Sequence, residues 1–239
     1  LKTLEKMRED FIGNVSHELR TPISVIKANS ETLLSTKLIK DENAINFTKA
    51  IQSQSERMAT IVNELLSISS MESGDYPISL DKLNIKNIVD SAIKELNPTT
   101  ELSNIKLVNK ISDVTHIIGD ESAIKIIISN YITNAIKHSP DDEIIEIDNE
   151  KIDKDFCRIK VIDNGIGIAK KYRERVFERF FRVDKGRSKK IGGTGLGLSI
   201  SKNLALMMGY SVGVESNEPK GSIFYIDVKI HQETSKEVA

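Results

Sequence analysis

A histidine near the start of the chain stands among residues that suit nucleophilic chemistry. A neutral imidazole can act as a nucleophile near neutral pH when an acceptor holds its second nitrogen. Glu18 follows His17 directly and can supply that acceptor, and Thr21 lies one helical turn further along the same face. At about 100° per residue, His17 lies about 160° from the apolar Val15 and Leu19, so we expect it to face solvent. The alternative is an ordinary surface histidine.

Two amides and an ammonium group follow at helical spacing farther along the chain. Asn130, Asn134 and Lys137 stand at i, i+4 and i+7, which places them on one stripe of a predicted helix. Amide oxygens suit a hydrated Mg²⁺, and lysine suits a phosphate. Asparagine is a poor helix former, so two of them on one stripe are unusual for a face that is merely solvated. The stripe is therefore a candidate site for a metal ion and a phosphate.

An acidic residue ends a hydrophobic, strand-like run just before two glycines. Asp163 is followed by Gly165 and Gly167, which permit a tight turn and the close approach of a ligand to the backbone. A buried carboxylate here could accept a hydrogen bond from an exocyclic amine such as that of adenine. The alternative is an Asx-type turn without a ligand.

A second glycine-rich segment runs directly into an apolar, periodic helix. It comprises Gly193, Thr194, Gly195, Leu196 and Gly197. Backbone N–H groups at a helix N-terminus suit phosphate binding. The segment lacks the Gly-Lys-Ser/Thr of a P-loop, and no strand immediately precedes it as in a dinucleotide-binding motif.

Between the two glycine-rich segments lies a stretch of aromatic and basic residues. The aromatic residues at 177–181 are expected to anchor a loop to the domain, and the basic residues that follow could close over a polyphosphate. Arg182 is best placed among them to contact a γ-phosphate. Residues 170–190 hold ten Lys or Arg against three acidic residues, whereas residues 141–155 hold two against eight. An ordinary basic surface loop is the alternative.

Composition limits the class of protein. The 239 residues hold 34 Lys and Arg against 35 Asp and Glu, a formal net charge of −1, which excludes a strongly basic nucleic-acid binder. The single Cys157 cannot form an intramolecular disulfide, and the four scattered histidines lack metal-ligand spacing. No apolar run reaches the roughly 18 residues that a membrane span needs. Because the chain opens inside a helical pattern, we expect a longer protein whose preceding part could hold membrane spans.

Residues 1–73 carry apolar side chains at helical spacing. Counted in heptads, seven of eight a and d positions in the second half are apolar, which predicts a helix with a bundle seam. These eight positions are Ala44, Phe47, Ile51, Gln54, Met58, Ile61, Leu65 and Ile68. With a second apolar stripe upstream and a polar turn at 35–43, the segment is predicted to be a helical hairpin. Because one hairpin buries little surface, we expect two copies to form a four-helix bundle, and therefore a homodimer.

The rest of the chain has a mixed pattern. We predict a linker at 74–81, one α/β domain at 82–232 with a largely mixed or antiparallel sheet, and a polar tail at 233–239. Predicted helices cover 85–96, 121–137 (capped by Asp120) and 197–208, and predicted strands cover 105–109, 144–149, 156–162, 211–215 and 222–230.

Taken in this order, the segments resemble the sensor histidine kinases of two-component systems, from about Phe11 to Phe224. Residues 11–22 resemble the family's H box, 130–139 its N box, 163–167 its first G box, 177–184 its F box, 193–197 its second G box, and 221–224 its last glycine-containing strand motif. The resemblance implies an α+β fold: a hairpin forming a dimeric four-helix bundle, then an ATP-binding α/β sandwich of the gyrase, Hsp90 and histidine-kinase type. Residues 182–185 and the full 193–197 loop are similar to phosphate-regulon sensor kinases.

The resemblance also implies an activity for the hairpin. His17 would take the γ-phosphate of ATP and become a phosphohistidine, with Glu18 as its general base. The phosphate would pass to an aspartate in the receiver domain of a response regulator that docks on the hairpin. Thr21 would orient water for dephosphorylating that regulator. The chain would then be the cytoplasmic portion of a membrane-anchored bacterial sensor.

The same likeness implies roles around the nucleotide. Asn134 would hold Mg²⁺, with Asn130 and Lys137 supporting the metal and the phosphates. Asp163 would accept the adenine amine within its glycine turn, and Arg182 with the loop 193–197 would hold the phosphates. His138 stands where the family often has an aromatic residue, and we expect it to stack on the nucleotide or contact a phosphate.

Two other classes of protein share part of this pattern. A pseudokinase hub would dimerise and dock a regulator without turnover, but His17, Glu18, Asn134 and Asp163 are intact. An ATPase of the gyrase or Hsp90 type would hydrolyse ATP without a phosphohistidine, and hydrolysis alone would not need a solvent-facing histidine beside a glutamate.

Overall fold

The computed structural model describes residues 2–35, 42–100, 103–112, 116–183 and 193–232. The side chains of residues 2–14, 16–17, 34–35 and 42–43 lie outside the described part, that of His17 among them. The chain divides into two compact units, Leu1–Gly74 and Asp75–Ala239. None of the helices in the described part has the length and apolar character that crossing a membrane requires.

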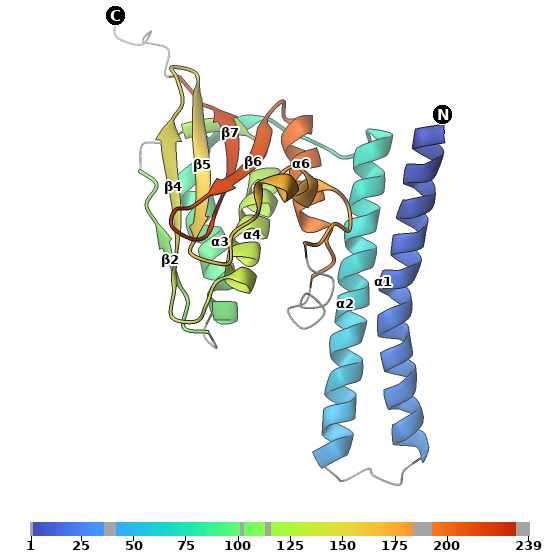
Figure 1. Cartoon of the computed structure of the whole chain (residues 1–239). Coiled ribbons are helices and arrows are strands. Elements are labelled where there is room, and N and C mark those ends of the chain that lie inside the picture. Colours follow the sequence, from blue (N-terminus) through green and yellow to red (C-terminus); the bar gives the residue numbers. More distant parts are fainter. Residues whose placement is uncertain (1, 36–41, 101–102, 113–115, 184–192, 233–239) are drawn as a thin grey trace, which may run out of the picture. The chain divides into compact units, whose positions relative to one another are not determined.

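The first unit is a helical hairpin, as predicted, formed by α1 (Lys2–Ser35) and α2 (Glu42–Ser73) (Figure 1). The connection is shorter than the predicted turn at 35–43, because Ser35 belongs to α1 and α2 already begins at Glu42; residues 36–41 lie outside the described residues. All eight predicted seam positions of α2 are buried or half-buried, with Ile61 and Ile68 at most 1% exposed. The heptad pattern therefore identified the packed face of this helix.

The second unit is built on a five-stranded sheet in the order β2–β4–β5–β7–β6 (Figure 1). Its strands are β2 (Lys106–Asn109), β4 (Ile144–Lys151), β5 (Phe156–Asp163), β6 (Ser211–Ser216) and β7 (Ser222–Lys229). The pair β2–β4 is parallel and the other pairs are antiparallel, which confirms the predicted mixed sheet.

A separate antiparallel pair was not predicted. It consists of β1 (Asp81–Asn84) and β3 (His116–Gly119), and a bridge between Ile117 and Ile230 joins it to the end of β7. Each strand has only four residues, too few for the alternation of apolar and polar residues to stand out. Asp81, the last residue of the predicted linker, is the first residue of β1.

Three helices cover one face of the five-stranded sheet: α3 (Ile85–Thr100), α4 (Glu121–His138) and α6 (Gly197–Met207) (Figure 1). The predicted cap of α4 is confirmed, because Oδ1 of Asp120 accepts a hydrogen bond from the N–H of Ala123 at 2.9 Å. The core combines alternate residues of β5 and β7 with the apolar face of α4. These buried residues are Cys157, Ile159, Val161, Phe224, Ile226, Val228, Ile127, Ile128 and Ile132. Two 3₁₀ turns, η1 (Lys170–Tyr172) and η2 (Arg175–Phe177), follow β5.

Candidate functional site

Asp163 ends β5 as a buried carboxylate, 3% exposed. Its Oδ1 accepts hydrogen bonds from the backbone N–H of Gly165 at 2.8 Å and of Ser222 at 3.1 Å. Burial raises the pKa of this carboxyl group, and the two N–H groups oppose that shift in part. Among the described residues nothing donates to Oδ2. That oxygen is therefore the atom of Asp163 that can accept a hydrogen bond from a ligand.

The glycine after Asp163 is required by the chain's own backbone. A Cβ on Gly165 would lie 2.4 Å from the carbonyl oxygen of His138 and 2.8 Å from Oδ1 of Asp163. Gly167 lies against Gly221, whose oxygen would be 3.1 Å from a Cβ at position 167. At Gly165 the group that approaches the backbone closely is the carbonyl at the end of α4. The contact joins the N box to the first G box.

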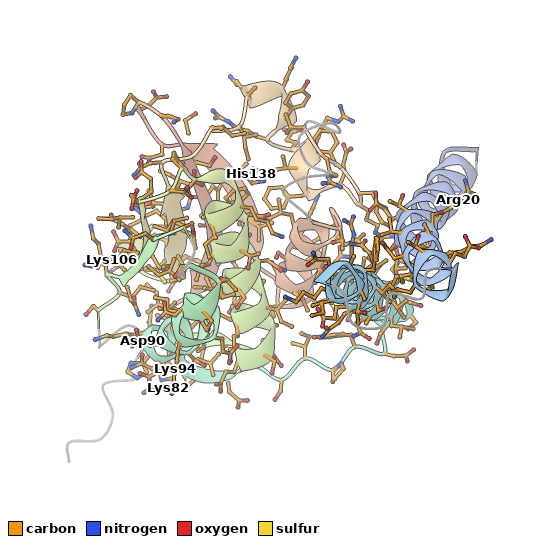
Figure 2. All side chains as sticks on the ribbon, turned by 90° about the horizontal axis from the view of Figure 1, so that it is seen from below. Arg20, Lys82, Asp90, Lys94, Lys106 and His138 are labelled. Atoms are coloured by element: carbon orange, nitrogen blue, oxygen red, sulfur yellow. The ribbon has the colours of Figure 1, made fainter. Side chains whose placement is uncertain are left out.

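His138 is the last residue of α4 and is labelled there in Figure 2. Its carbonyl accepts a hydrogen bond from the N–H of Ile166 at 3.3 Å. The pKa of its imidazole is lowered because surrounding protein atoms displace part of its hydration, and because Lys137 and Arg182 place positive charge nearby. The side chains of Lys137, His138 and Arg182, all predicted to contact the nucleotide, thus lie close enough to influence one another electrostatically. Two of the three are cations.

Asn130 makes a structural contact that the sequence did not predict. Its Nδ2 donates to the carbonyl of Gly197 at 3.0 Å and to Oγ of Ser201 at 3.1 Å, which ties α4 to the first turn of α6. Asn134 follows one turn later, is half-buried, and makes no side-chain hydrogen bond within the described part of the chain. Of the two amides, Asn134 has both polar atoms left for a ligand, whereas Asn130 uses its Nδ2 within the fold.

The second glycine-rich segment contacts both the N box and the F box. A Cβ on Gly193 would lie 3.7 Å from Nζ of Lys137. Gly195 has a φ of +76°, its carbonyl accepts from the N–H of Phe180 at 2.8 Å, and a Cβ there would lie 2.9 Å from Cα of Phe180. Only glycine fits a position with both constraints. The segment is therefore held against the domain at one end and borders Lys137 at the other.

The segment ends at the N-terminus of α6. The N–H of Leu196 donates to Oγ1 of Thr194 at 3.2 Å, and the fully buried Leu196 immediately precedes the helix. Arg182, two residues beyond Phe180, is half-buried. The basic residues at 185–190, predicted to close over a polyphosphate, lie outside the described residues.

In the hairpin, α1 carries His17, Glu18 and Thr21, so the predicted one-turn spacing between His17 and Thr21 holds. The predicted solvent-facing direction of His17 concerns a side chain outside the described part. Glu18 has a partner that the sequence did not predict: its Oε2 lies 3.0 Å from Nη2 of Arg57 on α2. Both side chains are half-buried, at 21% and 27% exposed. The sequence signal that could have indicated this ion pair is Arg57 itself, a basic residue on the flank of the apolar seam of α2.

The donor set fits a nucleotide and its metal ion. No group of three or more His, Cys, Asp or Glu side chains capable of holding a metal occurs among the described residues. Mg²⁺ bound to a nucleotide needs only one or two protein oxygens, because phosphates and water complete its octahedron. One amide oxygen from Asn134, one helical turn before Lys137, meets that requirement.

Comparison with known proteins agrees with this arrangement. Residues 7–74 match the His Kinase A (phospho-acceptor) domain, and residues 119–232 match the histidine kinase-, DNA gyrase B- and HSP90-like ATPase. Hairpin and α/β unit are thus a phospho-acceptor domain and a domain of this ATPase class. The chain belongs to the sensor histidine kinases of two-component systems.

Individual relatives place the chain more closely. It is 35% identical to the sensor-like histidine kinase SenX3 of Mycolicibacterium smegmatis, over 94% of this chain and 58% of that protein. It is 34% identical to the phosphate regulon sensor protein PhoR of Pseudomonas aeruginosa, over 92% and 50% respectively. The chain therefore spans between half and three fifths of these relatives' length. The predicted similarity to phosphate-regulon sensors is confirmed. The chain is similar to SenX3 to the same degree.

A solved structure shows the same architecture. Full-length ShkA in complex with AMPPNP is 25% identical to this chain with a TM-score of 0.69, and the match covers 95% of this chain and 47% of that one.

Proposed function

We propose that this chain binds ATP and transfers its γ-phosphoryl group to His17, and that the phosphohistidine passes the group to an aspartate of a response regulator. The observation that carries the proposal is the meeting of distant motifs in one α/β unit. The end of α4 contacts the turn after Asp163, and Lys137 borders the glycine segment that opens α6. A phospho-acceptor hairpin precedes this unit in the same chain.

The α/β unit supplies the nucleotide site. Oδ2 of Asp163 accepts a hydrogen bond from the exocyclic amine of adenine, since Oδ1 already accepts from two backbone donors. Lys137, Arg182 and the backbone N–H groups of 193–197 hold the phosphates, where a helix N-terminus adds favourable partial charge. His138 lines the site beside Lys137, and Asn130 keeps α6 in register with α4.

Asn134 holds the Mg²⁺ that accompanies the nucleotide. When bound, the ion neutralises phosphate charge and so favours attack by a neutral nucleophile. Lys137 lies one helical turn away and adds positive charge toward the same phosphates.

In the hairpin, a ring nitrogen of His17 attacks the γ-phosphorus, a P–N bond forms, and the P–O bond to the leaving ADP breaks. Glu18 accepts the hydrogen bond and then the proton from the other ring nitrogen, which keeps the imidazole nucleophilic. Arg57 anchors the carboxylate of Glu18 from α2. Thr21 orients the water that hydrolyses the phosphorylated regulator.

The functional unit is a homodimer formed through residues 1–73. Large apolar side chains on the hairpin remain exposed, among them Ile45 at 57%, Val62 at 43% and Leu66 at 64%. A second hairpin packing as a four-helix bundle would cover such a surface. The receiver domain of the regulator docks on the same bundle near His17.

The proposal is tested by incubating the chain with γ-labelled ATP and Mg²⁺ and measuring acid-labile, alkali-stable label on the protein. We expect label in the wild-type chain and its loss in both His17→Gln and Asn134→Ala. Label that persists in His17→Gln would refute the acceptor site. ATP hydrolysis without any protein-bound label would instead identify an ATPase of the gyrase or Hsp90 type.

A further inference from the structure

The turn between β6 and β7 reaches back to the end of β5 through a single amide. Nδ2 of Asn217 donates to the carbonyl oxygen of Asp163 at 2.9 Å and to Oδ1 of Asn164 at 3.0 Å. The N–H of Asn217 also donates to the carbonyl of Gly221 at 3.2 Å, which closes the turn on itself. One half-buried side chain thus connects this turn to two successive residues of the first G box.

The amide of Asn164 is fixed from both sides. Its Oδ1 accepts from Asn217, and its Nδ2 donates to Oε2 of Glu143 at 3.0 Å. Because a carboxylate can only accept, Glu143 determines which end of the Asn164 amide faces it. The oxygen of Asn164 must then face Asn217, which requires a donor at position 217.

The backbone of Asp163 is held by the same turn. A Cβ on Gly221, whose φ is +123°, would lie 1.9 Å from the carbonyl oxygen of Asp163, so the turn packs directly on this peptide. The next residue, Ser222, donates its N–H to Oδ1 of Asp163. The β6–β7 turn therefore contacts Asp163 at both its backbone and its side chain. Of the two carboxylate oxygens, Oδ2 remains available to accept a hydrogen bond from a ligand.

We propose that Asn217 is a positioning residue for adenine recognition: it holds Asp163 so that Oδ2 meets the exocyclic amine of the base. This inference rests on the proposed ATP site and names a residue outside its motifs. Both groups that Nδ2 of Asn217 faces are acceptors. The nearly isosteric Asn217→Asp would place an acceptor against two acceptors and reverse the interaction without changing the size of the side chain.

The test combines a change in the protein with a change in the base of the nucleotide and compares the four dissociation constants. They are measured by isothermal titration calorimetry with Mg²⁺ on the full chain. One ligand is a non-hydrolysable ATP analogue, and the other is the matching purine nucleotide without the exocyclic amine. We expect Asn217→Asp to weaken the adenine nucleotide about tenfold and the amine-free nucleotide less than about twofold. Asn217→Ala removes the donors without adding an acceptor, and we expect a loss of about threefold confined to the adenine nucleotide.

Asn87→Asp is the matched control. It makes the same chemical change at an exposed position of α3, where the side chain makes no hydrogen bond within the described part of the chain. We expect both dissociation constants to stay at wild-type values, which separates a local effect from added negative charge.

Equal weakening of both nucleotides by Asn217→Asp, or unchanged binding of both, would overturn the positioning role. A loss of folded protein without a change in the ratio of the two constants would also overturn it. Failure of the proposed function shows itself elsewhere, in a wild-type chain that does not bind ATP or does not distinguish the two bases.

Discussion

Asp163 combines two properties that oppose each other at a single residue. Its burial favours the neutral carboxyl form, while backbone donors at Oδ1 favour the carboxylate. Burial dominates, so its pKa in the folded chain lies above the ordinary value. The proposed recognition of adenine needs the ionised form as an acceptor, because a protonated carboxyl offers a donor to a group that is itself a donor. Binding and protonation of this residue are therefore coupled.

From this coupling we expect a pH dependence of ATP affinity. As pH falls through the raised pKa of Asp163, the carboxylate is protonated and affinity drops, at a higher pH than an exposed aspartate would show. The sign for stability is opposite. A raised folded pKa contributes stability at low pH, and that contribution is lost as pH rises through the folded pKa. Acidification should therefore weaken ATP binding, while protonation of this residue favours the folded chain.

The measurement is the dissociation constant of ATP from about pH 8 to about pH 5 for the wild-type chain and for Asp163→Asn. The variant cannot lose a proton here, so its profile should keep only the titration of the other groups at the site, the nucleotide and His138 among them. The difference between the two profiles reports Asp163. Parallel profiles would show that this carboxyl group does not titrate with binding.

At the scale of elements, α4 brings the nucleotide motifs together. One face of this helix packs in the core through Ile127, Ile128 and Ile132. Asn130 joins it to α6, and the carbonyl of His138 at its end meets the turn after Asp163. Rotation or displacement of α4 would therefore disturb both glycine-rich segments at once.

The two helices of the hairpin are joined by the ion pair of Glu18 and Arg57. Because both side chains are half-buried, we expect a double-mutant cycle of Glu18→Gln and Arg57→Met to give a coupling of about 1 kcal/mol in the free energy of unfolding. Urea unfolding at fixed protein concentration measures it.

The control pair is Lys27 and Glu31, which lie 3.8 Å apart on α1 with side chains 72% and 67% exposed. An exposed pair of this kind contributes little, so its cycle should give a coupling near zero. Equal coupling energies for the two pairs would mean that the Glu18–Arg57 contact does not hold the helices together.

For the whole molecule, the division into two units separates the phosphate acceptor from the nucleotide site. A lone two-helix hairpin buries little apolar surface, and Val62 and Leu66 stand one turn apart on α2 with large exposed areas. This surface is the physical basis of the proposed homodimer, because association would remove it from water.

We expect the double substitution Val62→Asp and Leu66→Asp to convert the proposed dimer to a monomer, as measured by sedimentation velocity at micromolar concentration. Burying two carboxylates at an interface costs far more than the contacts recover. Leu206→Asp on α6 is the control, because Leu206 is similarly exposed, at 59%, but belongs to the other unit. A double variant that sediments as the wild type would place the dimer contact elsewhere.

Much of this molecule follows from local pattern alone. Heptad spacing predicted the seam of α2, and alternation predicted five of the strands, because periodicity reflects which face of an element is buried. Motif order predicted the family, since each glycine, amide or acid stands at a spacing that its chemistry requires. The short strands β1 and β3 were not predicted, because four residues carry too little periodicity.

What only the tertiary structure decided are the partners of the polar groups. Asn130 was predicted as a ligand contact, and its Nδ2 in addition donates to a residue 67 positions away. Arg57 and Glu18 are 39 positions apart, and Asn217 and Asp163 are 54 apart. A hydrogen bond depends on distances of about 3 Å between atoms that the chain brings together only by packing its core. Periodicity in the sequence indicates which face of an element is buried, but it does not indicate which polar atoms form these hydrogen bonds. The sequence by itself thus determined most of the elements, the family and the residue types of the proposed site, and packing determined which side chains are held within the fold and which remain for a ligand.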